Sequence, residues 1–257
     1  MSKQRIYPVT SGKVRFLGQN KWFNLLCWWK PGFPRGGCNG VYWFTQIIAG
    51  LLFKILSIIS YLTCGLLFFR LKVKNKRVLE ICWGPMIVTP LHKSYFDNFF
   101  ILAFLLFSKL LPARAIAADW VFKTPIIGWA AKNLFGAYRL PQRKGLGLSL
   151  REMLREPLEF LQNGGVVGIY PEGGIRFKPG VHEVKVGAAF LAKESGAPIL
   201  PVAIKGIDYL SWKAFFFGRR KVVVIFGNPF LVDRTKSLSE ISEDIRQKIA
   251  DLYNENA

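Results

Sequence analysis

The chain has 257 residues, of which 51% are apolar and 20% are charged, and 36 Lys and Arg against 16 Asp and Glu give a formal net charge of +20. This composition excludes an intrinsically disordered chain, and the length is sufficient to bury a core. The four cysteines form no Cys-x-x-Cys pair and there are two histidines, so the sequence indicates neither a metal site nor a disulfide scaffold.

The N-terminal part of the chain, residues 1–79, contains thirteen Lys and Arg residues and no acidic residue. Within it, residues 41–69 carry Lys54 as their one charge and are longer than the roughly 20 residues that cross a bilayer. Because both flanks of this apolar stretch are basic, we expect a re-entrant helical hairpin near 41–69, with a single tilted span or a buried helix pair as alternatives. Residues 1–79 are therefore predicted to anchor the chain to an anionic phospholipid surface, and nucleic-acid binding is disfavoured.

From residue 80 to residue 257, short apolar runs alternate with helix-like stretches. This pattern predicts an α/β domain with a central, mostly parallel twisted sheet flanked by helices, joined to the membrane-associated helical segment. Strands are expected at residues 86–90, 115–118, 137–140, 166–170, 199–204 and 221–226. Helices are expected at residues 97–110, 126–133, 147–162, 186–195 and 237–254, the last with a capping-box spacing at its start.

The first candidate catalytic feature is the segment TPLHKSYFDNFF, which follows the strand expected at 86–90. On one continuous helix His92 and Asp97 would lie about 140° apart and would not meet. They meet if His92 lies in the turn and Asp97 in the first helical turn. The carboxylate then holds one imidazole nitrogen while the other takes a proton from a substrate hydroxyl. A helix-capping Asp beside an unrelated His is the alternative.

The second feature is the segment VVGIYPEGGIRFKPG, in which an apolar strand leads into Glu172, Gly173 and Gly174 before Arg176. Glycines at such a turn let backbone N–H groups approach an anion closely. Glu172 is a candidate for orienting a substrate or Arg176, and a purely structural turn with solvated charges is the alternative. The second histidine, His182, is predicted to be structural or exposed, because no Asp lies at the same spacing from it.

In this order and at this separation, the two features resemble the glycerolipid acyltransferase family typified by 1-acylglycerol-3-phosphate acyltransferases. The family's His-x4-Asp motif is similar to His92–Asp97, its Phe-Pro-Glu-Gly-Thr-Arg motif to Tyr170–Arg176, and its Pro-Val strand to the segment that contains Pro201. The resemblance covers roughly residues 80 to 228. The arginine of the Phe-Pro-Glu-Gly-Thr-Arg motif, the family's third, is displaced by one place here, to Arg176. The family's second motif, a Gly-to-Arg segment, has two candidate arginines here, Arg139 and Arg143.

The resemblance implies a membrane-bound O-acyltransferase of phospholipid biosynthesis that moves a fatty acyl group from an acyl thioester to the hydroxyl of a lysophospholipid. The favoured acceptor is 1-acylglycerol-3-phosphate (lysophosphatidate), which gives phosphatidate. His92 would be the general base and Asp97 its orienting partner. The residues that bind substrate would be Glu172, Gly173, Gly174, Arg176, Arg143, Arg139 and Pro201.

The same resemblance implies that no cofactor is bound and that acyl-CoA or acyl-[acyl carrier protein] is the co-substrate. It also implies a position on the cytoplasmic face of the inner or plasma membrane, where acyl thioesters are made. Because the arginines are displaced, another lyso-lipid or an amino-lipid acceptor remains an alternative. A non-catalytic membrane lipid-binding protein with the same fold is the other alternative, and the presence of both His92 and Asp97 argues against it.

Overall fold

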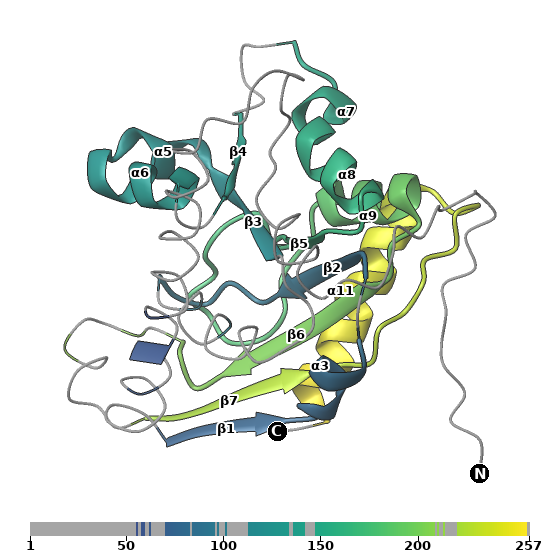
Figure 1. Ribbon diagram of the computed structural model, residues 1–257. Helices are drawn as coiled ribbons and strands as arrows, with labels where there is room; N and C mark the ends of the chain where they lie inside the picture. The colour runs from purple at the N-terminus through teal and green to yellow at the C-terminus, as the bar shows by residue number, and fades with distance from the viewer. Residues whose placement is uncertain are drawn as a thin grey trace.

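The computed structural model describes residues 55, 58–59, 62, 70–82, 84–95, 97, 101, 113–133, 136–141, 147–208, 210, 213 and 220–255. These residues form a seven-stranded sheet in the order β1-β7-β6-β2-β5-β3-β4 (Figure 1). Neighbouring strands are parallel except β6 and β7, which are antiparallel. The predicted α/β fold with a mostly parallel sheet is thus confirmed.

The elements occur in chain order as a set of strands separated by helices. The strands are β1 (Arg70–Lys74), β2 (Met86–Pro90), β3 (Ala113–Ala118), β4 (Tyr138–Leu140), β5 (Val166–Gly168), β6 (Ile199–Lys205) and β7 (Lys221–Phe226). The helices are α3 (Arg77–Ile81), α5 (Asp119–Lys123), α6 (Pro125–Asn133), α7 (Leu150–Met153), α8 (Arg155–Gln162), α9 (Val186–Ser195) and α11 (Leu238–Asn254).

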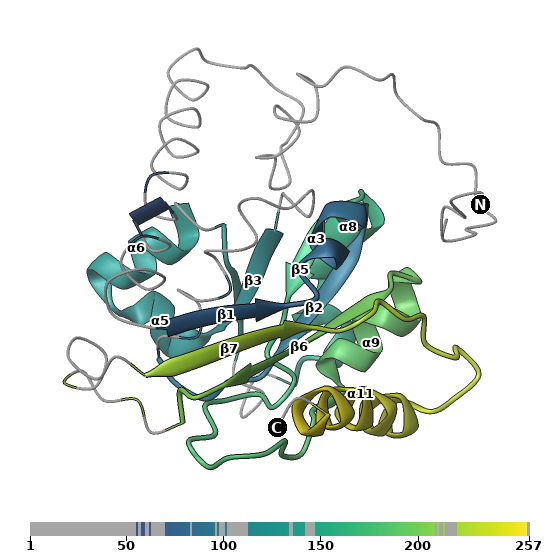
Figure 2. The same cartoon turned by 90° about the horizontal axis from the view of Figure 1, so that it is seen from below.

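The two faces of the sheet are covered by different helices. Helices α8, α9 and α11 pack on one face, where Ile87, Leu191 and Ile225 belong to one buried cluster. On the other face, Val78 and Leu79 of α3 join a second cluster with alternate residues of the same strands. Figures 1 and 2 show α9 and α11 lying together along the sheet. Strands β2 and β6 are therefore buried on both faces, which explains their unbroken apolar sequences.

One predicted helix is divided in the structure. The sequence pattern predicts a single helix over 147–162, whereas α7 ends at Met153 and α8 begins at Arg155, with Leu154 at φ −107° and ψ 14° between them. Pro157 explains the break, because in a continuous helix its ring would clash with the carbonyl of Met153 and would remove that carbonyl's hydrogen bond. Strand β5 also ends earlier than predicted, at Gly168, although the Ile169 N–H still donates to the Val88 carbonyl at 3.0 Å.

The sheet begins earlier in the chain than residue 80. Strand β1 pairs in parallel with β7 over five residues from Arg70, and α3 buries Val78 and Leu79. Residues 70–79, which were assigned to the N-terminal region from their charge pattern, are therefore part of the folded domain. The hairpin predicted near 41–69 and most of the helix predicted at 97–110 lie outside the described residues. No helix in the described part of the chain is long and apolar enough to cross a bilayer.

Candidate active site

The two sequence motifs meet at one edge of the sheet. His92 follows β2, and the turn that contains Glu172 follows β5, which is the parallel neighbour of β2. Parallel neighbours bring their carboxyl ends to the same edge, which is where functional side chains gather in such sheets. A backbone hydrogen bond from the Arg176 N–H to the His92 carbonyl, 2.7 Å long, joins the two loops.

His92 and Asp97 form a direct side-chain contact. The imidazole Nδ1 lies 2.8 Å from Asp97 Oδ2. The contact forms because His92 lies in the turn after β2 while Asp97 is already helical, the arrangement that the five-residue spacing requires. The Asp97 carboxylate is fully buried, and it also accepts hydrogen bonds from the backbone N–H groups of Lys93 and Ser94 at 2.6 and 3.0 Å and from Ser94 Oγ at 2.8 Å.

The hydrogen bonds around Asp97 determine which imidazole nitrogen of His92 can receive a proton. The donors around Asp97 all meet its carboxylate oxygens, which only accept hydrogen bonds. Asp97 therefore accepts a hydrogen bond from the Nδ1–H of His92, which leaves Nε2 as the nitrogen that can receive a proton. The His92 side chain is 18% exposed, whereas Asp97 is enclosed. The pair therefore has one buried, oriented end and one end open to a substrate.

Tyr170 forms a wall beside the imidazole. Its ring stacks on that of His92 with centroids 3.9 Å apart and an angle of 16° between the planes. Burial raises the pKa of the Tyr170 hydroxyl well above its ordinary value, and the charge of Asp97 raises it further. Tyr170 therefore remains neutral and acts as a flat surface that fixes the ring plane of His92. This role was not predicted from the sequence, although the aromatic residue at the start of the third motif was an available signal.

Glu172 faces into the protein. Its side chain is fully buried, Oε2 accepts from the His92 N–H at 3.1 Å, and Oε1 accepts from the His182 N–H at 3.0 Å. Lys93, also fully buried, places its Nζ 3.4 Å from Glu172 Oε1. The Glu172 carboxylate thus connects the turn after β2 to the loop between β5 and α9, and the fully buried side chain offers no exposed surface to a substrate. In the same turn, Gly173 is exposed and Gly174 is half-buried.

Lys93 is a buried residue of the site that the sequence does not predict. Its Nζ also donates to the carbonyls of Lys178 and Gly180, at 3.2 and 2.5 Å. A lysine beside a histidine in a polar segment is typical of a solvated charge, so no local signal predicted its burial. The other histidine, His182, is half-buried, and its ring nitrogen Nε2 lies 3.2 Å from the Lys178 carbonyl oxygen, in agreement with a structural role.

The remaining predicted substrate residues are dispersed. Arg176 is exposed beside His92. Arg139 of β4 forms an ion pair with Asp119, the first residue of α5. Lys123 and Arg139 lower the pKa of the Asp119 carboxyl by hydrogen bonding to it. Arg143 lies outside the described residues.

Pro201 lies inside β6 and does not form part of an exposed wall. It is buried opposite Thr89 in the register of β2 and β6. A Cβ at Gly227 would lie 2.6 Å from Pro201 Cγ and 3.2 Å from a methyl carbon of Leu252. The proline ring therefore fills the space that Gly227 leaves open near α11, on the face of the sheet that α9 and α11 cover.

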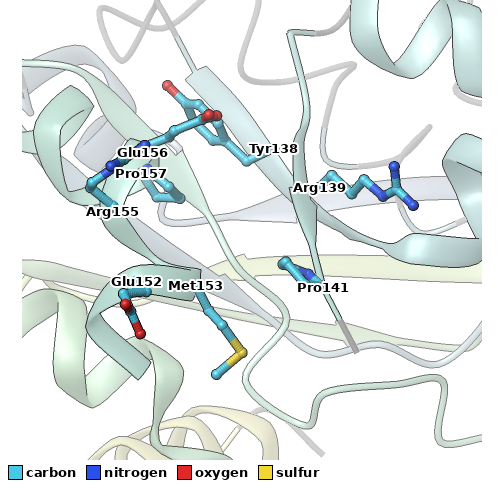
Figure 3. A pocket seen from close by; sticks show the side chains of 8 residues that line it. All are labelled: Tyr138, Arg139, Pro141, Glu152, Met153, Arg155, Glu156 and Pro157. Atoms are coloured by element: carbon cyan, nitrogen blue, oxygen red, sulfur yellow. The ribbon is translucent and has the colours of Figure 1, made fainter. Parts of the chain in front are cut away.

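A pocket of about 160 Å³ lies beside β4 (Figure 3). It is lined by residues of β4, α7 and α8 and of the segments next to them, namely Tyr138, Arg139, Pro141, Glu152, Met153, Arg155, Glu156 and Pro157. Its lining carries two arginines and two glutamates, so it has no net preference for an anion. In Figure 3 the Arg139 side chain extends away from Glu152 and Glu156, which agrees with its ion pair to Asp119.

The fold and this geometry together define an α/β domain with a hydrogen-bonded His92–Asp97 pair at the carboxyl edge of its sheet. The profile of the acyltransferase family matches residues 70–205, more than half of the chain. The chain belongs to the acyltransferase family. Among the described residues, no group of three His, Cys, Asp or Glu side chains is arranged to hold a metal ion.

Named relatives agree with this membership. The chain is 24% identical over 190 residues to a chloroplastic 1-acyl-sn-glycerol-3-phosphate acyltransferase of Brassica napus, covering 73% of this chain and 52% of that protein. It is 26% identical over 175 residues to the 1-acyl-sn-glycerol-3-phosphate acyltransferase of Pseudomonas aeruginosa, covering 67% of this chain and 56% of the relative. The match thus spans about half the length of these curated relatives.

A solved structure has the same fold. The crystal structure of the 1-acyl-sn-glycerophosphate acyltransferase from Thermotoga maritima superimposes with a TM-score of 0.59 at 20% identity, covering 81% of this chain and 83% of that one. The predicted resemblance to glycerolipid acyltransferases is therefore confirmed at the level of the family, with distant relatives of the lysophosphatidate type.

Proposed function

We propose that the protein is an O-acyltransferase that transfers a fatty acyl group from acyl-CoA or acyl-[acyl carrier protein] to the hydroxyl of a lysophospholipid. The favoured acceptor is 1-acylglycerol-3-phosphate and the product is then phosphatidate. The observation that carries this proposal is the 2.8 Å contact between His92 Nδ1 and the fully buried Asp97 carboxylate, in a chain of the acyltransferase family.

In the proposed reaction, His92 Nε2 accepts the proton of the acceptor hydroxyl as its oxygen attacks the thioester carbonyl carbon. Asp97 accepts a hydrogen bond from Nδ1–H, keeps the imidazole in the required tautomer and stabilises the imidazolium that forms. The tetrahedral intermediate then collapses, the carbon–sulfur bond breaks and His92 returns the proton to the departing thiolate. The products are the acylated lipid and the free thiol, and no covalent acyl-enzyme or bound cofactor is needed.

The surrounding residues have positioning roles in this scheme. Tyr170 fixes the plane of the imidazole by stacking. Glu172 and Lys93 hold the two motif loops together through buried contacts, so Glu172 acts through His92 and does not bind the lipid itself. Arg176 is the described arginine best suited to an acceptor phosphate, because its backbone is bonded to His92 and its side chain is exposed. We assign Arg143 the same role from the sequence alone.

One contact favours a second candidate acceptor. Arg139 is engaged by Asp119, so one of the arginines that the resemblance assigns to the phosphate is already neutralised. A lyso-lipid with a smaller negative charge, or an amino-lipid, would need fewer cations. We keep this acceptor class as the alternative, and we propose a membrane position on the cytoplasmic face for either acceptor, anchored by the N-terminal region.

The test is an assay of the purified full chain with labelled acyl thioester against a panel of lyso-lipid acceptors. We expect transfer to lysophosphatidate in the wild type and a loss of about 10³-fold or more in His92→Ala. The matched control is His182→Ala, which is expected to keep its rate within about threefold, because it retains the backbone N–H that Glu172 accepts and removes only a ring beside the Lys178 carbonyl.

Two results would contradict the proposal. Near-normal turnover by folded His92→Ala would show that another group is the base. If the wild type acylates none of the lyso-lipids and amino-lipids in the panel, with either thioester, the enzymatic function is rejected and a lipid-binding role is supported.

A further inference from the structure

Helices α5 and α6 present large apolar side chains to the outside of the domain. Trp120 is 53% exposed, Ile126 82%, Ile127 54% and Trp129 58%. Single exposed apolar residues are common on protein surfaces, but a cluster of this kind marks an interaction surface. These four residues lie within ten positions of the chain. We call the two helices that carry them, residues 119–133, the α5–α6 hairpin.

The exposure follows from how the two helices pack. Gly128 of α6 is buried, and a Cβ on it would lie 2.6 Å from the backbone oxygen of Phe122 in α5. The helices therefore approach at a glycine, and they can do so only with the Gly128 side of α6 turned inward. Ala131 is buried on the same side. The remaining surface of α6, which carries Ile126, Ile127 and Trp129, is directed outward.

The charges of the hairpin are positive where they are exposed. Lys123 and Lys132 are exposed, and the one acidic residue of the segment, Asp119, is buried and paired with Lys123 and Arg139. Tryptophan beside lysine on a short apolar helix suits the headgroup region of a bilayer, where indole rings and ammonium groups are both well solvated. An anionic lipid surface is also complementary to a chain with a net charge of +20.

The hairpin lies at the catalytic edge of the sheet. Helix α5 begins directly after β3, which is parallel to β5, and β5 is parallel to β2, the strand that leads to His92. In Figures 1 and 2, α5 and α6 lie side by side on the side toward which β6 points and away from α9 and α11. A membrane that contacts the hairpin would therefore face the edge where a lipid hydroxyl must reach His92.

We propose that the α5–α6 hairpin is a bilayer-docking surface of the catalytic domain, whose partner is the headgroup layer of an anionic phospholipid membrane. Ile126, Ile127, Trp120 and Trp129 insert at the level of the headgroups, and Lys132 contacts lipid phosphates. The purpose of this docking, to supply lipid to the site, rests on the proposed function, whereas the docking itself can be tested without catalysis.

The first arm measures backbone hydrogen exchange of the full chain with vesicles of phosphatidylcholine, with and without phosphatidylglycerol. We expect amides of residues 119–133 to exchange about tenfold more slowly on the anionic vesicles, with less protection at high salt, while α11 is unchanged. The double variant Ile126→Ser/Trp129→Ser should lose this protection. Leu231→Ser, which removes an equally exposed apolar side chain (60%) elsewhere, should retain it.

The second arm compares acyl transfer to a long-chain acceptor in vesicles with transfer to a short-chain acceptor dispersed in water. We expect the double variant to be about tenfold slower on the vesicle acceptor and within about twofold of wild type on the dispersed one. If wild type transfers no acyl group to either acceptor, vesicle-dependent protection that the double variant loses still supports the docking surface while the proposed function fails.

Three outcomes would overturn the docking surface. The first is protection of residues 119–133 that is equal in the double variant and the wild type. The second is an equal loss of activity on both acceptors, which would assign the hairpin to support of the active site. The third is protection that rises with protein concentration in the absence of vesicles, which would assign the surface to contact between copies of the chain.

Discussion

The carboxylate of Asp97 receives more hydrogen bonds than orientation of an imidazole alone requires. Besides His92, it accepts from the backbone of Lys93 and from the backbone and hydroxyl of Ser94. These donors belong to the turn that connects β2 to the helical turn at Asp97, so the same carboxylate closes the turn and orients the His92 ring. Local geometry and proposed chemistry are thus determined by one side chain, which is why a five-residue spacing suffices to recognise the pair.

Removal of the buried Lys93 charge should destabilise the protein through Glu172. In Lys93→Met, Glu172 keeps its two backbone donors but loses its counter-ion, and we expect the free energy of unfolding to fall by about 3 kcal/mol. In the double variant Lys93→Met/Glu172→Gln the buried negative charge is also absent. The free energy of unfolding of the double variant should therefore fall by less than the sum of the decreases in the two single variants.

Urea unfolding of the two single variants and the double variant measures this coupling. Strictly additive losses would show that Lys93 and Glu172 do not interact in solution. A His182→Ala variant serves as the reference for a change in the same loop region, because the His182 backbone N–H, and not its ring, contacts Glu172.

At the level of elements, local sequence predicted most of the helices and strands. Strands β2 and β7 and helix α9 have the predicted bounds, because continuous apolar runs and flanking turn residues mark them. The capping box at the start of α11 is present, with Ser237 accepting from the Glu240 N–H and Glu240 accepting from the Ser237 N–H. Pro157 is a local signal of the break between α7 and α8, although the sequence pattern predicts one helix over 147–162.

The capping box of α11 leads to a stability prediction. Ser237→Ala removes the side-chain acceptor for the Glu240 N–H, and we expect a loss of about 1 kcal/mol. Thermal unfolding should show this as a lower Tm. Ser239→Ala, an exposed site two residues further along the same helix, should be neutral or slightly stabilising because alanine is the better helix former. Equal Tm values for the Ser237→Ala variant and the wild type would mean that the cap contributes nothing in solution.

At the level of the whole molecule, the position of β1 determines where the chain can be shortened. Strand β1 supplies the parallel partner of β7, and α3 supplies Val78 and Leu79 to the core on one face. A chain that starts at residue 80 lacks β1, Val78 and Leu79 and leaves the edge of β7 without its partner, so we expect it to be unfolded or aggregated. A chain that starts at residue 70 keeps both elements, and we expect a cooperative thermal transition.

Circular dichroism and size-exclusion chromatography of the two shortened chains test this expectation. A chain starting at residue 80 that unfolds cooperatively with the same Tm as the chain starting at residue 70 would show that β1 and α3 are dispensable. The comparison also defines the residue at which the catalytic domain begins.

The α/β class, the central strands and the family could be predicted from the sequence, because they depend on runs and spacings within short segments. The structure was needed to show that His92 contacts Asp97, that Lys93 is buried against Glu172, that Arg139 pairs with Asp119, that Pro201 packs under Gly227 and that Arg70–Lys74 forms the edge of the sheet. Except for the His92–Asp97 pair, these contacts join segments that are distant in sequence or that follow different strands. Whether these contacts form depends on the spatial order of the strands in the sheet. The sequence around a charged residue or a proline does not indicate which distant segment will lie beside it.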